Sequence, residues 1–256
     1  MANCGFYERF KESIVVNTKR VYDSCATKDY IENLRCYFTE SAQSIIEQSA
    51  SVKVRSASII GAEVKIEPIP FRRGFFSIEQ NFYFDVGIEA LLVKASNNLN
   101  ALCIFSKNMT MFGSDSSAKI YSSDRGLADQ NQSDIPKAVV QVSNPIILSS
   151  SLNDVNYAED LGKVPIIPDE IINYFGGNLI YLNVSKYVSV TMGLFAITHI
   201  EREVQMLIPS YDFGRPVKEC NNGINSREEF DNMDFPLDNF FPPLGSFCVS
   251  SVKRNA

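Results

Sequence analysis

Hydrophobic and polar residues alternate along much of the first half of the chain. In the stretch 52–69 the alternating apolar positions are Val52, Val54, Val64, Ile66 and Ile69. In the stretch 76–88 they are Phe76, Ile78, Phe82, Phe84, Val86 and Ile88. An apolar residue at every second position is typical of a strand with one buried face. The pattern therefore predicts antiparallel strands that are joined by short polar turns.

The stretch 177–208 also predicts β-structure, because it is rich in β-branched and aromatic residues. We expect breaks in it at 183–184 and at 201–203. Each of the last strong strands is followed by a glycine, Gly113 or Gly214, where a turn that needs a positive φ is expected.

Helix is scarce, and we expect only short helices near the N-terminus. One is predicted over 29–38, with Thr27 as its N-cap and with Tyr30, Ile31 and Leu34 on one face. A second is predicted within "TESAQSIIEQSA", residues 39–50.

Several segments recur in the same order along the chain. "VKVRSASII" (52–60) resembles "VQVSNPIIL" (140–148), and "YFDVGIEALL" (83–92) resembles "YVSVTMGLFA" (187–196). "LCIFSKNMTMFG" (102–113) resembles "VQMLIPSYDFG" (204–214) with a one-residue gap. Matches in register indicate an internal duplication. We therefore expect a mainly β protein with two tandem antiparallel β-sandwich-like domains and extended terminal arms.

The predicted organisation has four parts. Residues 1–18 form an N-terminal arm, 19–118 a first β-domain with a connector motif, 119–217 a second β-domain, and 218–256 a C-terminal arm rich in Pro and Phe. Three similar connectors punctuate them: "RVYDSC" (20–25), "KIYSSD" (119–124) and, more loosely, "PVKEC" (216–220). The C-terminal arm is expected to lie on its own surface or on a neighbour's, through the anchors Phe230, Phe235, Phe240 and Phe241.

Charge and composition exclude some classes of binding partner. The 256 residues carry a formal net charge of -6, with 45% hydrophobic and 21% charged residues. This acidic balance argues against non-specific binding to nucleic acid or to anionic lipid. No window resembles a membrane-spanning segment. The start, "MANCGFYERFKES", lacks the apolar core of a signal peptide, so we expect synthesis in the cytosol and no membrane insertion.

Candidate catalytic and metal-binding groups are few. The only histidine, His199, lies in a strand-like run and is expected to be structural. Neither a CxxC motif nor a phosphate-binding loop is present. The acidic cluster within 227–239 lacks the spacing of an EF-hand and is interpreted as a solvated arm. We predict a protein that is not an enzyme and that holds no cofactor and no metal.

The six cysteines are unevenly placed. Cys103 lies in an apolar run and is expected to be a core residue. The remaining cysteines lie towards the two ends of the chain and are candidate crosslinks between subunits: Cys4, Cys25, Cys36, Cys220 and Cys248. A disulfide requires Cα atoms within about 7 Å of each other, and the sequence does not give these separations. The disulfide partners therefore stay open.

The stretch 19–39, "KRVYDSCATKDYIENLRCYFT", resembles a motif of clostridial spore-coat and ribbon-like spore-appendage structural proteins. The later segments "VKVRSASII" and "PFRRGFFSIEQNFYF" add to the resemblance. Tyr30 stands where that family has a cysteine, which puts a disulfide within the motif in doubt. The resemblance implies assembly on the spore surface, as coat, exosporium or appendage, after synthesis in the mother-cell cytoplasm without a signal peptide. It implies no catalytic residues.

The leading interpretation is thus a structural protein that self-assembles into a spore-surface layer, ribbon or filament. Its partners would be copies of itself and paralogous spore-surface proteins. Subunits would meet through the terminal arms, with disulfides as candidate crosslinks. The alternative is a tandem β-sandwich binding module for a glycan or peptide ligand. An enzyme, most plausibly a carboxylate-dependent hydrolase, is the third hypothesis.

Overall fold

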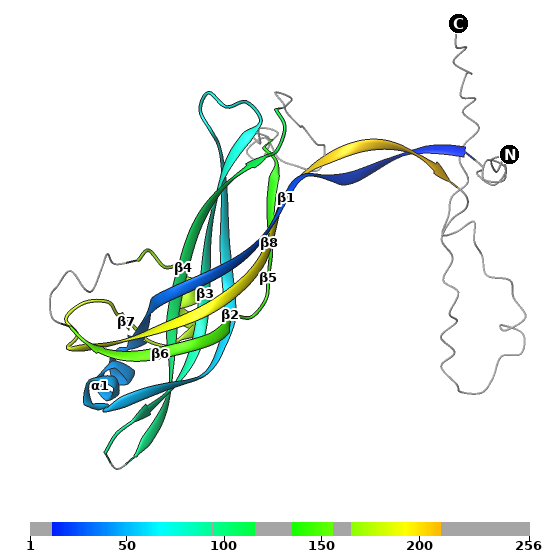
Figure 1. The fold of residues 1–256 in the computed structure, drawn as a ribbon. Coiled ribbons are helices and arrows are strands. Elements are labelled where there is room, and N and C mark those ends of the chain that lie inside the picture. The colour runs from blue at the N-terminus through cyan, green and yellow to red at the C-terminus, as the bar shows by residue number, and fades with distance from the viewer. Residues whose placement is uncertain (1–11, 94, 116–134, 156–164, 211–256) are drawn as a thin grey trace, which may run out of the picture. The chain divides into compact units, whose positions relative to one another are not determined.

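A computed structural model describes residues 12–93, 95–115, 135–155 and 165–210 (Figure 1). The chain divides into two compact units. The barrel unit is Thr18–Val204, and the end unit combines Met1–Asn17 with Gln205–Ala256. Of the end unit, the described residues are 12–17, which begin the strand Glu12–Thr39, and 205–210, which end the strand Lys186–Ser210.

Strands make up most of the described residues, as the sequence predicted. In chain order the elements are β1 (Glu12–Thr39), α1 (Glu40–Gln48), β2 (Ser51–Pro68), β3 (Phe75–Leu91), β4 (Ser96–Phe112), β5 (Lys137–Val142), β6 (Ile146–Asp154), α2 (Asp169–Tyr174), β7 (Leu179–Ile180) and β8 (Lys186–Ser210). These two helices are too short and too polar to span a bilayer.

The strands form one sheet with the order β2-β3-β4-β1-β8-β5, and β6 also pairs with β8. The β3–β4 ladder is unbroken from Phe75↔Phe112 to Leu91↔Ser96. Strands β5 and β6 pair with successive parts of β8. The pairs β1–β4, β2–β3, β3–β4, β5–β8 and β6–β8 are antiparallel, which confirms the predicted strand orientation.

Strands β1 and β8 come from opposite ends of the barrel unit and lie side by side (Figure 1). The backbone N–H of Asn33 donates to Thr191 Oγ1 at 3.4 Å, and Lys19 Nζ lies 3.0 Å from Glu201 Oε1. Since the partner number on β8 rises as the number on β1 falls, the two strands run antiparallel.

The sheet curls until its two edges approach each other. Strand β2, at one edge, contacts β6 and β5 at the other. The backbone N–H of Ile59 in β2 donates to Oδ1 of Asn144, in the corner between β5 and β6, at 3.1 Å. The result is a nearly closed barrel, which leaves little unpaired strand edge.

Alternating residues of the strands fill the interior. On β3 the buried positions include Phe82, Phe84, Val86 and Ile88, as the period of two predicted. Strands β1, β4 and β8 add Phe38, Cys103, Met192 and their neighbours to the same core cluster. Helix α1 packs Ile46 into this cluster, so the helix covers apolar side chains of the barrel.

A polar layer lies between this cluster and a second one around Ile78 and Met111. Gln80 is fully buried and donates from Nε2 to Thr198 Oγ1 at 2.8 Å. Its partner across the β3–β4 ladder, Lys107, donates to Asp29 Oδ2 at 2.6 Å. Buried polar groups are costly unless they are hydrogen-bonded, so this layer constrains how the strands align.

Residues 165–185 cover part of the outer face. Ile171 and Phe175, in and after α2, pack against Tyr83 and Leu102 on the outside of β3 and β4. Gly61 of β2 lies under α2, and a Cβ placed there would be 3.2 Å from Ile171 Cδ1. The small residue therefore permits the close approach of α2 to the sheet.

The predicted helix over 29–38 is wrong, because these residues belong to β1. Pairing with β4, in the register Cys36↔Cys103, overrides the helix-like spacing of Tyr30, Ile31 and Leu34. The second predicted helix is confirmed as α1. The expected break at 201–203 is also absent, since β8 continues through it to Ser210.

Two separate β-sandwich-like domains are not what the structure shows. Strands from the predicted ranges 19–118 and 119–217 share one sheet within the barrel unit. The connector 20–25 lies in β1, while the connectors 119–124 and 216–220 lie outside the described residues. Two halves that pair edge to edge bury one common core, which replaces two smaller cores. The duplication itself stays a prediction from the sequence.

Gly113 does not have the expected positive φ; Ser114, which follows it, has a φ of 64°. The reason for glycine at 113 is space. A Cβ there would lie 2.9 Å from Ile200 Cγ2 and from Pro136 Cγ, and 3.0 Å from Phe76 Cδ2. Gly214 lies outside the described residues.

Candidate functional site

An apolar groove runs over three neighbouring strands of the barrel unit; we call it the β1/β8/β5 groove. It has a volume of about 450 Å³ and is lined by Ala26, Thr27, Gln141, Val142, Ser143, Phe195, Ala196 and Ile197. Phe195 and Ile197 are 44% and 45% exposed. They occupy alternate positions of β8, so their rings and methyl groups share the outer face of the sheet.

The groove is bordered by one cation and one thiol. Lys28 Nζ lies 5.8 Å from the centroid of the Phe195 ring, at the distance of a cation–π contact. Cys25 is exposed and directly precedes Ala26, which lines the groove. A molecule seated in the groove would therefore meet apolar surface first, with a positive charge and a thiol at its border.

The end unit also exposes apolar side chains. Met206, Leu207 and Ile208 are consecutive residues of β8, and they are 45%, 67% and 38% exposed. Val15 of β1 is 65% exposed. Consecutive side chains of a strand point to opposite faces, so this part of β8 is apolar on both faces.

The predicted crosslinking cysteines have different surroundings. Cys25 is exposed on β1, where another chain can reach it. Cys36 is buried, and its Sγ lies 3.1 Å from Cys103 Sγ, which corrects the expectation of a residue at a subunit boundary. Cys103 is a core residue, as predicted. The remaining candidates lie outside the described residues: Cys4, Cys220, Cys248, Phe230, Phe235, Phe240 and Phe241.

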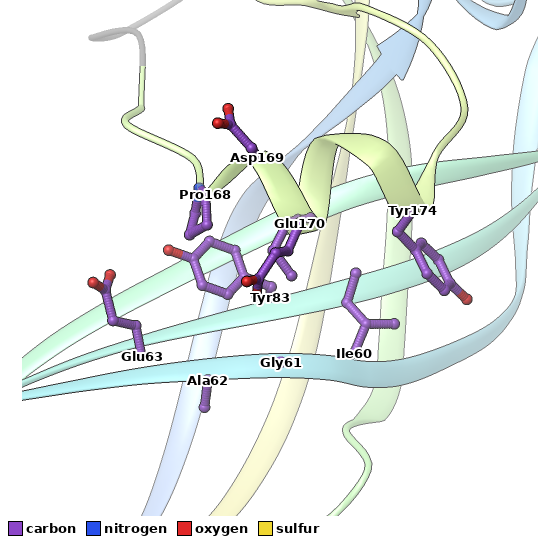
Figure 2. A pocket seen from close by; sticks show the side chains of 10 residues that line it. Ile60, Gly61, Ala62, Glu63, Tyr83, Pro168, Asp169, Glu170 and Tyr174 are labelled. Carbon is purple, nitrogen blue, oxygen red and sulfur yellow. The ribbon is translucent and has the colours of Figure 1, made fainter.

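A second concave site lies between β2 and α2 (Figure 2). This cleft has a volume of about 610 Å³, and its lining includes Glu63, Tyr83, Asp169, Glu170 and Tyr174. Figure 2 shows α2 passing over β2, with the rings of Tyr83 and Tyr174 under different parts of the helix. The sheet supplies Glu63 and Tyr83, and the α2 segment supplies the other three residues.

Local contacts set the ionisation of the cleft. Lys65 lies 3.1 Å from Glu63, and its hydrogen bond lowers the pKa of the Glu63 carboxyl. Burial, and then the nearby Glu63 carboxylate, raise the pKa of the Tyr83 hydroxyl. Tyr174 donates to Asp85 Oδ2 at 3.1 Å, and this carboxylate raises the pKa of the Tyr174 hydroxyl. At neutral pH the cleft therefore presents a carboxylate beside tyrosines that remain protonated.

The single histidine, His199, lies on β8 beside an acidic residue of the same strand. His199 Nε2 lies 3.6 Å from Glu201 Oε2, two residues along β8. Its side chain is largely covered. Over the ranges that the structure describes, His, Cys, Asp and Glu side chains do not come together in groups of three that suit a metal ion.

Neither concave site was predicted from the sequence. The groove had a signal: residues 194–197, "LFAI", are apolar without interruption, so the strand has two apolar faces and the barrel can bury only one. The cleft had none, because β2 and α2 are far apart in sequence. Comparisons of the chain with family models, with curated proteins and with solved structures give no match.

Proposed function

We propose that the chain is a structural protein that assembles with copies of itself and carries out no turnover chemistry. The observation that carries the proposal is the exposed apolar lining of the β1/β8/β5 groove, above all Phe195 and Ile197. Contiguous apolar surface that remains open to water is typical of protein–protein contact sites. The exposed run Met206, Leu207 and Ile208 in the end unit adds a second surface of the same kind.

The occupant that suits the groove is the phenylalanine-rich segment of another copy. That segment contains Phe230, Phe235, Phe240 and Phe241, and acidic residues lie among them. The phenylalanines match the apolar lining, and the acidic residues complement Lys28 at its border. A contact between different surfaces of identical chains does not close on itself unless its rotation does, so it favours a ribbon, layer or filament.

The spore surface, as coat, exosporium or appendage, is the proposed location, with paralogous surface proteins as further partners. The support is the resemblance of residues 19–39 to clostridial spore-coat and appendage proteins. This stretch forms much of β1 and contributes Ala26 and Thr27 to the groove. The residues that carry the resemblance therefore also contribute to the candidate contact surface.

The test uses the purified full chain and the substitution Phe195→Lys. Wild-type protein should sediment as large assemblies that electron microscopy shows as ordered polymers. Phe195→Lys should remain monomeric, because it places a charge where the proposed partner inserts apolar groups. Circular dichroism would verify that the variant keeps its β-structure.

Phe71→Lys is the matched control, because Phe71 is a fully exposed phenylalanine of the β2–β3 turn. It should assemble as the wild type does. A wild-type chain that stays a monodisperse monomer under oxidising conditions would contradict the proposed function. Normal assembly of Phe195→Lys would contradict the groove as the contact surface.

The cleft between β2 and α2 favours a second candidate function, the binding of a glycan or peptide. Its carboxylates and tyrosine hydroxyls suit hydroxyl and amide groups of such ligands. Calorimetry with glycan and peptide panels should then give saturable binding to wild type, and weaker binding to Glu63→Gln. The absence of saturable binding to either panel would remove this candidate.

A further inference from the structure

Cys36 and Cys103 are direct partners across the β1–β4 ladder. Directly opposed residues of an antiparallel pair have Cα atoms roughly 4.5–5.5 Å apart. Disulfides are found at Cα separations of about 4.4–6.8 Å. The backbone register thus already holds the two residues at a separation that a disulfide requires.

The side chains complete this geometry. Both point into the barrel core, where Cys36 is 3% and Cys103 0% exposed. Their Sγ atoms lie 3.1 Å apart as two thiols. Since a sulfur–sulfur bond measures about 2.05 Å, a shift of roughly 1 Å would bring the atoms to bonding distance. Each of the two thiols therefore has its disulfide partner directly opposite on the neighbouring strand.

We propose that Cys36 and Cys103 form a disulfide within one chain under oxidising conditions, which joins β1 covalently to β4. The bond would form inside the barrel unit, so it does not depend on assembly between copies. It would also remove Cys36 from the cysteines that can link subunits, and leave the exposed Cys25 on the same strand available for links between chains.

The core that holds the pair also controls when it can react. Burial, and then the hydrogen bond with Cys36, raise the pKa of the Cys103 thiol well above its ordinary value. The thiolate is the attacking species in disulfide exchange, and reagents do not reach a side chain without exposed surface. Oxidation should therefore proceed while the chain folds, or during opening of β1, and be slow in the closed barrel.

The oxidant required is a small-molecule disulfide, RSSR, such as oxidised glutathione. One cysteine thiolate attacks RSSR, forms a mixed disulfide and releases RS⁻. The second thiolate attacks the protein sulfur of that mixed disulfide, forms the Cys36–Cys103 bond and releases a second RS⁻. In total the two thiols lose two protons and two electrons, and RSSR becomes two RSH.

The test is peptide mapping of the full chain after refolding in a glutathione buffer, with iodoacetamide added in denaturant to block the remaining thiols. Trypsin releases peptides 36–53, 95–107 and 21–28, each with a single cysteine, because Arg35, Lys53, Lys94, Lys107, Arg20 and Lys28 are cleavage sites. We expect 36–53 joined to 95–107, with a mass two hydrogen atoms below the sum of the separate peptides. In the monomer fraction, peptide 21–28 should be joined to neither of them. In a parallel sample that is folded reduced and then oxidised, linkage should be much slower.

Variants keep the test decisive. Cys36→Ser should leave 95–107 alkylated, and the double variant Cys36→Ala, Cys103→Ala should unfold at the same urea concentration with and without reductant. Wild type should unfold at a lower urea concentration once it is reduced. Recovery of 36–53 and 95–107 both alkylated from oxidised monomer, or linkage of either to another cysteine, would overturn the proposal.

Discussion

Lys19 of β1 and Glu201 of β8 form an ion pair across the strand pair that joins the two ends of the barrel unit. Lys19 Nζ lies 3.0 Å from Glu201 Oε1. The Glu201 side chain is only 10% exposed, whereas that of Lys19 is 55% exposed. The hydrogen bond from Lys19 holds the pKa of the Glu201 carboxyl below its ordinary value.

We predict that Glu201→Gln lowers the free energy of unfolding by about 0.5–1 kcal/mol at neutral pH. The folded-state pKa of Glu201 is depressed, so its stabilisation is present above the unfolded pKa of roughly 4.3. It is lost as the pH falls through the lower folded value. The gap between wild type and variant in urea denaturation should therefore shrink below about pH 4.

A double-mutant cycle separates the pair from other effects of the substitution. Lys19→Met combined with Glu201→Gln should cost less than the sum of the two single changes. A Glu201→Gln deficit that stays constant down to the acid range would show that the carboxylate charge is not its cause.

Arg202→Met should destabilise the barrel unit by about 2–3 kcal/mol, because the charged guanidinium donates hydrogen bonds to two backbone carbonyls. Arg202 Nε donates to the carbonyl of Gly113 at 2.6 Å, and Nη2 donates to that of Ser114 at 3.0 Å. Arg55→Met is the control: Arg55 pairs with Glu89 at the surface, so its loss should cost less than about 1 kcal/mol. Equal urea midpoints for the two variants would contradict this reading of Arg202.

Gly113→Ala should lower stability by about 1–3 kcal/mol, because its methyl group would overlap Ile200, Pro136 and Phe76. Gly193→Ala offers a matched comparison on β8, since no atom lies within 4 Å of a Cβ at that position. It should be neutral or slightly stabilising. Thermal unfolding of both variants would reveal whether space or backbone conformation explains the glycine at 113.

Cys25→Ser should remove most of any reductant-sensitive dimer that wild type forms in oxidising buffer, because Cys25 is exposed beside the β1/β8/β5 groove. Non-reducing gel electrophoresis measures this directly. The double variant Cys36→Ser, Cys103→Ser should keep the dimer, since both of these thiols are buried. A dimer band that is unchanged in Cys25→Ser would place the crosslink at other cysteines.

Strands β2 and β3 were predictable because one face of each meets a core, which leaves a period of two in the sequence. Strand β8 was predictable from its β-branched and aromatic residues. Strand β1 was not, because Tyr30, Ile31 and Leu34 have helical spacing. Their strand conformation comes from pairing with β4 and β8, which lie far away in sequence. The local conformational preference of a segment does not reveal which distant strands it pairs with.

In the candidate sites, too, features that depend on local sequence were predictable, and features that depend on long-range strand pairing were not. Cys25 was a candidate for accessibility because it lies towards an end of the chain, and it is exposed. The meeting of Cys36 with Cys103, in contrast, depends on the β1–β4 register. Strands from the two predicted β-domains share one sheet for a related reason. Similar segments predict similar strands, yet the order in which strands pair is decided by how much apolar surface the whole sheet can bury.

The pairing of β1 with β8 has a consequence for synthesis on the ribosome. Strands β2, β3 and β4 can pair with one another and with β1 as soon as they emerge. The other edge of β1 must wait, because Asn33 and its partner Thr191 are 158 positions apart. During that interval the nascent chain presents an unpaired strand edge, which is a template for pairing with neighbouring nascent chains. Once β8 has been translated, it can pair with this edge of β1, and the edge is then closed to pairing with other chains.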